Sequence, residues 1–246
     1  MGRRYSAKGK KKRKLEDGAT SRDDDAAELP PPEDDEGMVE EDVTEEDETV
    51  EVVAEGIPVL PRPVDGRKRP RAIFVLERAC LEVGKVGKAL LAIFDSPLTK
   101  AGRLQAVYVR TEKGVLFEVK PNVRLPRTPK GFCGLMSQLL QKLSITAVGR
   151  REKLLNLIKN PVTQYLPVGS RKIGLSYSAD KSVELNDYVA ECSDDEALVF
   201  VVGAMAHGKI DNEYTDEYIR ISSHPLSAAS CLARICTALE QKWNIQ

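Results

Sequence analysis

Two continuous apolar runs of strand length constrain the fold of this chain more than any other feature. Residues 72–76 read Ala-Ile-Phe-Val-Leu, and residues 197–202 form a second run that ends at Gly203. A run without polar alternation is typical of a strand that is covered on both faces. Parallel strands of this kind need crossover connections, usually helices. The two runs therefore predict an α/β architecture.

The other periodic segments fit this architecture. Residues 104–109 and 115–119 flank Glu112-Lys113-Gly114 and predict a hairpin, and residues 173–177 predict a short strand. Helical spacing predicts two amphipathic helices, one carrying Phe132, Leu135, Leu139 and Leu143, the other Leu226, Ala229, Leu232, Cys236, Leu239 and Trp243. We expect Ser222 or Ser223 to cap the second helix and Pro225 to lie in its first turn. The fold class is α/β with a largely parallel sheet.

Charge divides the chain near residue 70. Residues 1–15 hold eight Lys or Arg and no acid, whereas residues 16–55 hold nineteen Asp or Glu and one base. Segments this polar cannot bury enough apolar surface to offset chain entropy, so we expect residues 1–70 to be disordered and residues 71–246 to fold. The basic run from Lys8 to Lys14 is typical of a solvated tail, and in some proteins of a nuclear import signal. Residues 56–246 carry 28 bases and 19 acids, which favours a polyanionic partner.

Several function classes are disfavoured. The five cysteines include no Cys-x-x-Cys pair and the chain has two histidines, which argues against zinc and for reduced, buried thiols. No apolar run is long enough to span a bilayer. The segment Gly84–Lys88 lacks the following Ser or Thr of a phosphate-binding loop. No Gly-x-Gly-x-x-Gly follows a strand, which argues against a Rossmann cofactor site.

Three segments remain as candidate binding sites. Residues 201–209 lead a predicted strand into a loop with Gly203 and Gly208, where backbone can approach a flat ligand closely. Residues 221–228 turn into the last helix and offer free amides to adenine or to a carboxylate. Arg124 and Arg127 lie on a proline-stiffened loop, and guanidinium forks suit phosphates. The ordinary structural interpretations are a tight turn, a capped helix start and a solvated surface pair.

Seven blocks, taken in order, resemble one family. They are Asp95-Ser96-Pro97-Leu98 with Lys100-Ala101-Gly102, Arg124-Leu125-Pro126-Arg127-Thr128, Phe132-Cys133-Gly134-Leu135-Met136, Gln138-Leu139-Leu140, Lys159-Asn160-Pro161, Val202-Gly203-Ala204 with His207-Gly208-Lys209, and Pro225-Leu226-Ser227-Ala228. Over residues 71–246 the chain resembles the pseudouridine-N1-specific ribosomal RNA methyltransferases of the SPOUT superfamily. The resemblance implies a mostly parallel sheet with a C-terminal trefoil knot, a homodimer, and S-adenosyl-L-methionine as cofactor.

The resemblance also implies a set of site residues. By motif position, the cofactor contacts would be Leu175, Gly203, Gly208, Ile221, Ser222, Ser223, His224, Pro225 and Leu226. The RNA contacts would be Arg124 and Arg127, with Lys130 as a substitute for a third basic position that Gly131 occupies here. The resemblance identifies no general base. The implied partners are small-subunit ribosomal RNA and pre-ribosomal assembly factors, in the nucleus and nucleolus, and no membrane.

The chain departs from the family pattern before Asp95. The family has a long stretch there that contains Arg-Pro-Asp-Ile-x-His-Gln, whose Arg and Asp help form the RNA site, whereas this chain runs from Lys88 directly into Ala89. In addition, His224 stands where the family usually has Tyr. Two hypotheses follow. The chain is either a methyltransferase acting on N1 of a pseudouridine in small-subunit ribosomal RNA, with a role in subunit biogenesis, or a catalytically silent RNA-binding assembly factor with the same fold.

Overall fold

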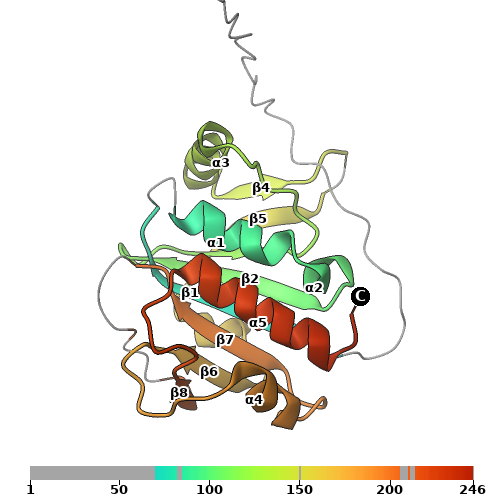
Figure 1. Cartoon of the computed structure of the whole chain (residues 1–246). Helices are drawn as coiled ribbons and strands as arrows, with labels where there is room; N and C mark the ends of the chain where they lie inside the picture. The colour runs from blue at the N-terminus through green and yellow to red at the C-terminus, as the bar shows by residue number, and fades with distance from the viewer. Residues whose placement is uncertain (1–69, 82–84, 150, 206–209, 211–213, 246) are drawn as a thin grey trace, which may run out of the picture. The chain divides into compact units, whose positions relative to one another are not determined.

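A computed structural model describes residues 70–81, 85–149, 151–205, 210 and 214–245. These residues all belong to one compact unit. The charged tail that the sequence predicts to be disordered lies outside them up to residue 69. Within the described residues, eight strands form one sheet in the order β4-β5-β3-β2-β1-β7-β6-β8 (Figure 1). The predicted α/β class with a mostly parallel sheet is confirmed.

The sheet has a parallel half and an antiparallel half. The parallel half contains β1 (Ala72–Ala79), β2 (Leu104–Thr111), β6 (Arg171–Leu175), β7 (Leu198–Gly203) and β8 (Glu217–Ile219). The antiparallel half is built by β3 (Leu116–Val119), β4 (Ser144–Thr146) and β5 (Lys153–Ile158), which extend the sheet from β2. The apolar runs 72–76 and 197–202 become the neighbouring central strands β1 and β7.

Alternating side chains of β1 and β7 enter two separate cores. Phe74 of β1 and Phe200 of β7 stack with ring centroids 6.0 Å apart in the larger core. Ile73 of β1 and Val199 of β7 point to the opposite face and are fully buried in the smaller core. Because side chains alternate across a strand, two buried faces require an unbroken apolar run, as the sequence showed.

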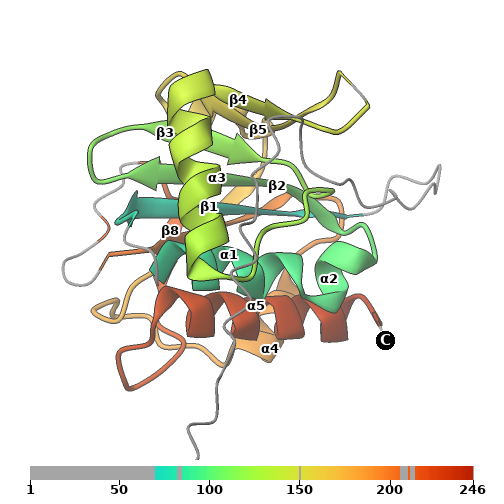
Figure 2. The ribbon, with the colours of Figure 1, turned by 90° about the horizontal axis from the view of Figure 1, so that it is seen from above.

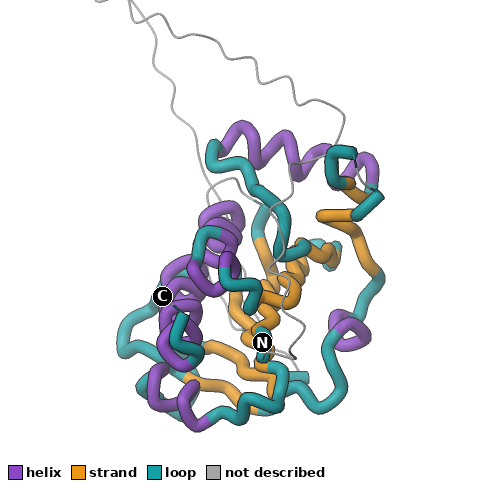
Figure 3. The backbone as a smooth tube through the Cα atoms, turned by 90° about the vertical axis from the view of Figure 1, so that its right-hand side faces the viewer, coloured by secondary structure: helices purple, strands orange, loops and turns teal. Residues whose placement is uncertain are grey.

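Helices gather mainly on one side of the sheet (Figures 2 and 3). They are α1 (Lys85–Phe94), α2 (Pro97–Lys100), α3 (Pro129–Lys142), α4 (Leu185–Glu191) and α5 (Ala228–Lys242), with a 3-10 helix η1 at Val162–Tyr165. The long α5 packs against α1, α2 and α4. The opposite face is closed by loop residues such as Leu166 and Ile210 and by Val162 of η1.

Three predictions about helix ends are wrong. The last helix is capped by Ser227, whose hydroxyl accepts from the Ser230 amide at 3.2 Å, and not by Ser222 or Ser223. Pro225 therefore lies before the helix and not in its first turn. Leu143 adopts a left-handed conformation with φ of 62° at the end of α3 and is 58 % exposed, so it leaves the apolar stripe on which it was placed.

Candidate functional site

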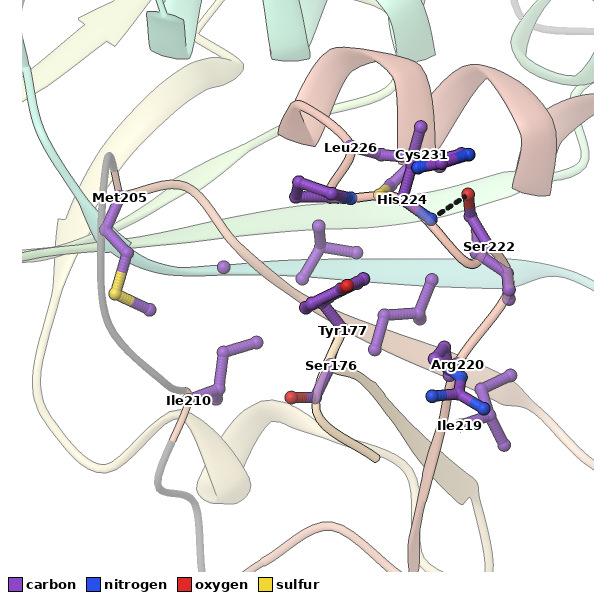
Figure 4. A pocket seen from close by; sticks show the side chains of 15 residues that line it. Ser176, Tyr177, Met205, Ile210, Ile219, Arg220, Ser222, His224, Leu226 and Cys231 are labelled. Carbon is purple, nitrogen blue, oxygen red and sulfur yellow. Dashed lines mark hydrogen bonds between the residues drawn. The ribbon is translucent and has the colours of Figure 1, made fainter. Parts of the chain in front are cut away.

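A pocket of about 370 Å³ opens at the carboxyl ends of β6, β7 and β8 (Figure 4). Its wall consists of Leu175, Ser176, Tyr177, Val202, Gly203, Met205, Ile210, Ile219, Arg220, Ile221, Ser222, His224, Pro225, Leu226 and Cys231. Each of the three strands thus contributes the residues where it ends, and Cys231 comes from the first turns of α5. The carboxyl ends of parallel strands are where open α/β sheets bind ligands.

The pocket brings together most of the residues predicted to bind the cofactor. Seven of them line it, namely Leu175, Gly203, Ile221, Ser222, His224, Pro225 and Leu226. Ser223 is exposed and does not line it, and Gly208 lies outside the described residues. These residues are brought together from two strand ends and the chain before α5. Their role in binding a cofactor stays a prediction.

Two glycines keep this region tightly packed. At Gly174 a Cβ atom would come within 2.6 Å of the Tyr218 ring, so β6 can pair with β8 only if this position has no side chain. At Gly203 a Cβ would meet Ile210 Cγ1 and Met205 Cε at 3.1 Å each. The lack of a side chain at Gly203 therefore lets Ile210 and Met205 pack closely against the end of β7.

A buried carboxylate lies next to the loop after β7. Glu77, at the end of β1, is 1 % exposed, and its backbone oxygen accepts from the Ala204 amide at 2.9 Å. Its side chain accepts from Tyr214 Oη at 2.8 Å and lies 3.7 Å from the Arg110 guanidinium. Burial raises the pKa of Glu77, while Tyr214 and Arg110 oppose that shift. The backbone of Glu77 thus holds Ala204, and its side chain holds Tyr214. These two residues lie before and after the loop that follows β7.

A second polar cluster fixes β8. The carboxylate of Glu217 accepts from Arg171 Nη2 at 2.6 Å, from Tyr188 Oη at 2.6 Å and from Lys181 Nζ at 2.5 Å. Burial alone would raise the pKa of Glu217, but hydrogen bonds from Lys181, Tyr188 and Arg171 outweigh it and lower the pKa to about 2. We call these four residues the Glu217 network. It ties β8 to β6 and α4, and none of its four residues lines the pocket.

The residues predicted to bind RNA lie at the other edge of the sheet. Arg124 and Lys130 are exposed, and Arg127 Nη2 lies 3.2 Å from Asp95 Oδ1. Asp95 directly follows α1 and precedes β2, which places it at the amino ends of the parallel strands. The pocket is at the carboxyl ends, and the eight residues of β1 span about 26 Å. The structure therefore does not bring the predicted RNA residues to the pocket within one chain.

The local structure explains why position 131 is a glycine. It lies in the first turn of α3, where a Cβ would come within 2.9 Å of both Pro126 Cβ and Thr128 Oγ1. Thr128 caps this helix by accepting from the Gly131 amide. A basic side chain at position 131 would displace the cap, so Lys130 is the basic residue that this turn can present.

Sequence reasoning missed several lining residues. Ser176 and Tyr177 follow β6, and the sequence placed Tyr177 inside the strand. Arg220 follows β8, a three-residue strand too short for a periodic signal. Cys231 was treated as one of five core thiols. Among these thiols, Cys192 and Cys236 are buried, whereas Cys80, Cys133 and Cys231 are partly exposed.

In the described part of the chain, no group of three or more His, Cys, Asp or Glu side chains is arranged to hold a metal ion. No helix in the same ranges is long and apolar enough to cross a membrane.

The sequence and fold were compared with known proteins. The family described as EMG1/NEP1 methyltransferase matches residues 86–240. The ribosomal RNA small subunit methyltransferase NEP1 of Mus musculus is 43 % identical over 206 residues, covering 71 % of this chain and 83 % of that protein. The protein of the same name from Homo sapiens is 42 % identical over 221 residues, covering 76 % and 89 %.

A solved structure has the same fold. The crystal structure of Archaeoglobus fulgidus Nep1 bound to S-adenosylhomocysteine matches with a TM-score of 0.57 and 18 % identity, covering 72 % of this chain and 99 % of that one. This likeness concerns the fold, whereas the family match and the two mammalian relatives concern the sequence itself. On that sequence evidence, this chain belongs to the EMG1/NEP1 methyltransferase family.

Proposed function

We propose that this chain transfers a methyl group from S-adenosyl-L-methionine to N1 of a pseudouridine in small-subunit ribosomal RNA. We propose that it does so as a knotted homodimer during small-subunit assembly in the nucleolus, together with pre-ribosomal assembly factors. The observation that supports the proposal is the pocket, which is lined by residues from three strand ends and the start of α5, seven of them among the predicted cofactor contacts. Both mammalian relatives are named ribosomal RNA small subunit methyltransferase NEP1, which supports ribosomal RNA as the substrate class.

The residues of the pocket fit the proposed cofactor. A volume of about 370 Å³ is within the range of small-molecule sites. Gly203 contributes only backbone to the pocket wall, and the apolar side chains of Val202, Ile221 and Leu226 suit an adenine ring. When bound, S-adenosylmethionine supplies a methyl group that its sulfonium already activates. The remaining task of the protein is to position the acceptor and exclude water.

Positioning falls to two groups of residues. The pocket walls hold the cofactor rigidly and keep water from the transfer site, while Arg124, Arg127 and Lys130 bind RNA phosphates. The target base would be splayed out of its loop, as is usual when chemistry is done on a base. The described lining contains no carboxylate, and we assign no general base.

The separation of these two groups favours a homodimer. Within one chain, Arg127 lies beside Asp95 at the amino ends of the parallel strands, whereas the pocket lies at their carboxyl ends. A symmetric pair would offer RNA both a pocket and a second set of arginines. Sedimentation equilibrium of the full chain should give twice the monomer mass, and a monomer at micromolar concentration would contradict this part of the proposal.

The decisive experiment is methyl transfer. The full chain is mixed with labelled S-adenosylmethionine and either of two RNA hairpins that differ only in having pseudouridine or uridine at one loop position. We expect label in the pseudouridine hairpin alone, because N1 of pseudouridine carries a proton and N1 of uridine is bonded to ribose. Label in both hairpins would reject the N1 specificity.

The absent family stretch before Ala89 favours the second candidate, a silent assembly factor. For that function we expect RNA and cofactor binding without label transfer to either hairpin.

A further inference from the structure

Arg220 is the one formally charged residue among the described residues that line the pocket. It directly follows β8 and is partly buried. Its Nε atom is buried and has no hydrogen-bond partner in the part of the chain that the structure describes. A guanidinium stays protonated at any physiological pH, so this is a buried donor on a permanent cation.

The backbone around Arg220 is held on both sides. Its amide donates to the Lys181 oxygen at 2.8 Å, and its own oxygen accepts from the Val183 amide at 3.0 Å. These bonds extend β8 and fix where the Arg220 side chain begins. Nearby cations, by contrast, are satisfied, because Lys181 and Arg171 both donate to Glu217. Arg220 takes no part in that network.

Buried polar groups without partners are rare in native proteins, and each one needs an explanation. A desolvated guanidinium nitrogen is unfavourable unless an acceptor meets it. No acidic side chain belongs to the described wall of the pocket, so the described lining supplies no counter-charge to Arg220. An anionic group on a bound ligand would supply one.

The position of Arg220 indicates which end of a ligand it meets. In Figure 4, Arg220 and Ser176 lie toward one end of the pocket, and Leu226 and Cys231 lie toward the other, beside the start of α5. S-adenosylmethionine has a matching asymmetry. One end is the neutral adenosine, and the other is an amino acid with a carboxylate and an ammonium group, with the sulfonium between them.

We propose that Arg220 binds the carboxylate of the amino-acid part of S-adenosylmethionine and thereby sets the orientation of the cofactor in the pocket. This inference rests on the proposed function. The adenosine then lies toward Leu226 and Cys231, and the Ser176 hydroxyl is available to accept from the ammonium group. Pairing the guanidinium with the carboxylate also offsets the repulsion between Arg220 and the positive charges of the cofactor.

The test combines a change in the protein with a change in the ligand. Calorimetry on the full chain measures Kd for S-adenosylhomocysteine and for its decarboxylated analogue, with wild type, Arg220→Met and Lys181→Met. Methionine retains most of the apolar stem of arginine. Lys181→Met is the matched control, because it removes a cation one segment away that pairs with Glu217 and does not line the pocket.

Wild type and Lys181→Met should bind the decarboxylated ligand about tenfold to a hundredfold more weakly than S-adenosylhomocysteine, as expected for loss of a charged hydrogen bond. Arg220→Met should bind both ligands with similar, weak affinity. If Arg220→Met discriminates as strongly as wild type, the carboxylate binds elsewhere, for instance at the start of α5, and the proposal is wrong.

If wild type binds neither ligand, the proposed function itself fails.

If Arg220→Met does not fold, as circular dichroism would reveal, Arg220→Lys replaces it. Lysine keeps the charge but lacks the Nε donor, so it should discriminate less than wild type, and full discrimination would overturn the proposal. A smaller salt dependence of RNA binding in Arg220→Met, with unchanged ligand discrimination, would reassign the residue to RNA phosphate.

Discussion

At the scale of single residues, the positions that matter most are those where a side chain is missing or lacks a partner. Gly203 lets Ile210 and Met205 approach the end of β7, Gly174 lets β6 approach Tyr218, and Arg220 presents an unpaired donor. The sequence identified Gly203 because glycine after a buried strand is a recognisable pattern. It did not identify Arg220, because nothing in a linear sequence tells an unpaired arginine from a solvated one.

Gly203→Val should weaken S-adenosylhomocysteine binding by about tenfold or more while the fold stays intact. A Cβ at this position would come within 3.1 Å of Ile210 and Met205, which both line the pocket, so valine would displace these side chains within the pocket. Overpacking of this kind typically costs about 1–3 kcal/mol. Calorimetry measures the loss and circular dichroism monitors the fold.

Gly87→Ala is the control for this substitution. Gly87 is buried in α1, where a Cβ would make ordinary contacts of 3.4 Å or more with the Phe132 ring, outside the pocket. It should bind the ligand as wild type does. Unchanged affinity in Gly203→Val as well would mean that the loop after β7 does not contact the cofactor.

At the scale of elements, sequence predicted the long and uniform ones. The central strands, the β2–β3 hairpin and the helices α3 and α5 were all found, because their apolar periods extend over a whole element. Strands β4, β5 and β8, helices α1, α2 and α4 and the 3-10 helix η1 were missed. β4 and β8 have three residues each, and β8 is held mainly by the Glu217 network, which joins residues up to 46 positions apart. No local pattern reports such a contact.

Glu217→Ala should destabilise the chain by about 2–3 kcal/mol at pH 7, since it removes an acceptor of several charged hydrogen bonds and leaves Arg171 without its partner. The folded-state pKa of about 2 lies below the ordinary value of 4.5. The stabilisation is therefore complete above pH 4.5 and is lost as pH falls toward 2. Urea denaturation at pH 7 and pH 3 measures both effects.

Asp180→Ala controls for the loss of a carboxylate. Asp180 is exposed, and none of the ion pairs among the described residues includes it. It should change stability little at either pH. A difference between Glu217→Ala and wild type that is as large at pH 3 as at pH 7 would contradict the assigned network.

The loop before α3 allows a separate test of RNA binding. Arg124→Ala and Arg127→Ala should each weaken RNA binding and reduce its salt slope by about one. Arg127 now lies beside Asp95 with 78 % of its side chain exposed, so it can exchange this partner for a phosphate at little cost. Cofactor affinity should stay unchanged, because the pocket is at the opposite edge. Fluorescence anisotropy at several salt concentrations provides the slopes, and unchanged slopes would make these arginines ordinary surface charges.

At the scale of the whole molecule, the family comparison explains what the residues alone could not. Charge, strand runs and helix stripes predicted an α/β protein with a polyanionic partner. They did not specify the chemistry, because the motifs that carry it are short loops with ordinary structural interpretations as well. The structure adds that these loops meet in one pocket, and that the predicted RNA residues lie elsewhere on the same sheet.

The place of the absent family stretch is occupied by an unbroken helix. α1 runs through Lys88 and Ala89, and Val86, Ala89, Leu90 and Ile93 are fully buried on its inner face. The fold therefore closes without the stretch. The proposed cofactor pocket has no described lining residue from α1, so we expect cofactor binding and RNA methylation to separate.

The chain should bind S-adenosylmethionine normally and yet methylate RNA poorly. Losing one charged RNA contact weakens binding about tenfold to a hundredfold, and a misplaced target base reduces the rate about a hundredfold further. Single-turnover methylation is compared between this chain, a version with a family-like stretch between Lys88 and Ala89, and a version with a Gly-Ser insert of the same length. The Gly-Ser version controls for the interruption of α1. Only the family-like version should be faster, with equal cofactor affinity in all three. Equal rates for this chain and the family-like version, both folded by circular dichroism, would show that the stretch is dispensable for catalysis.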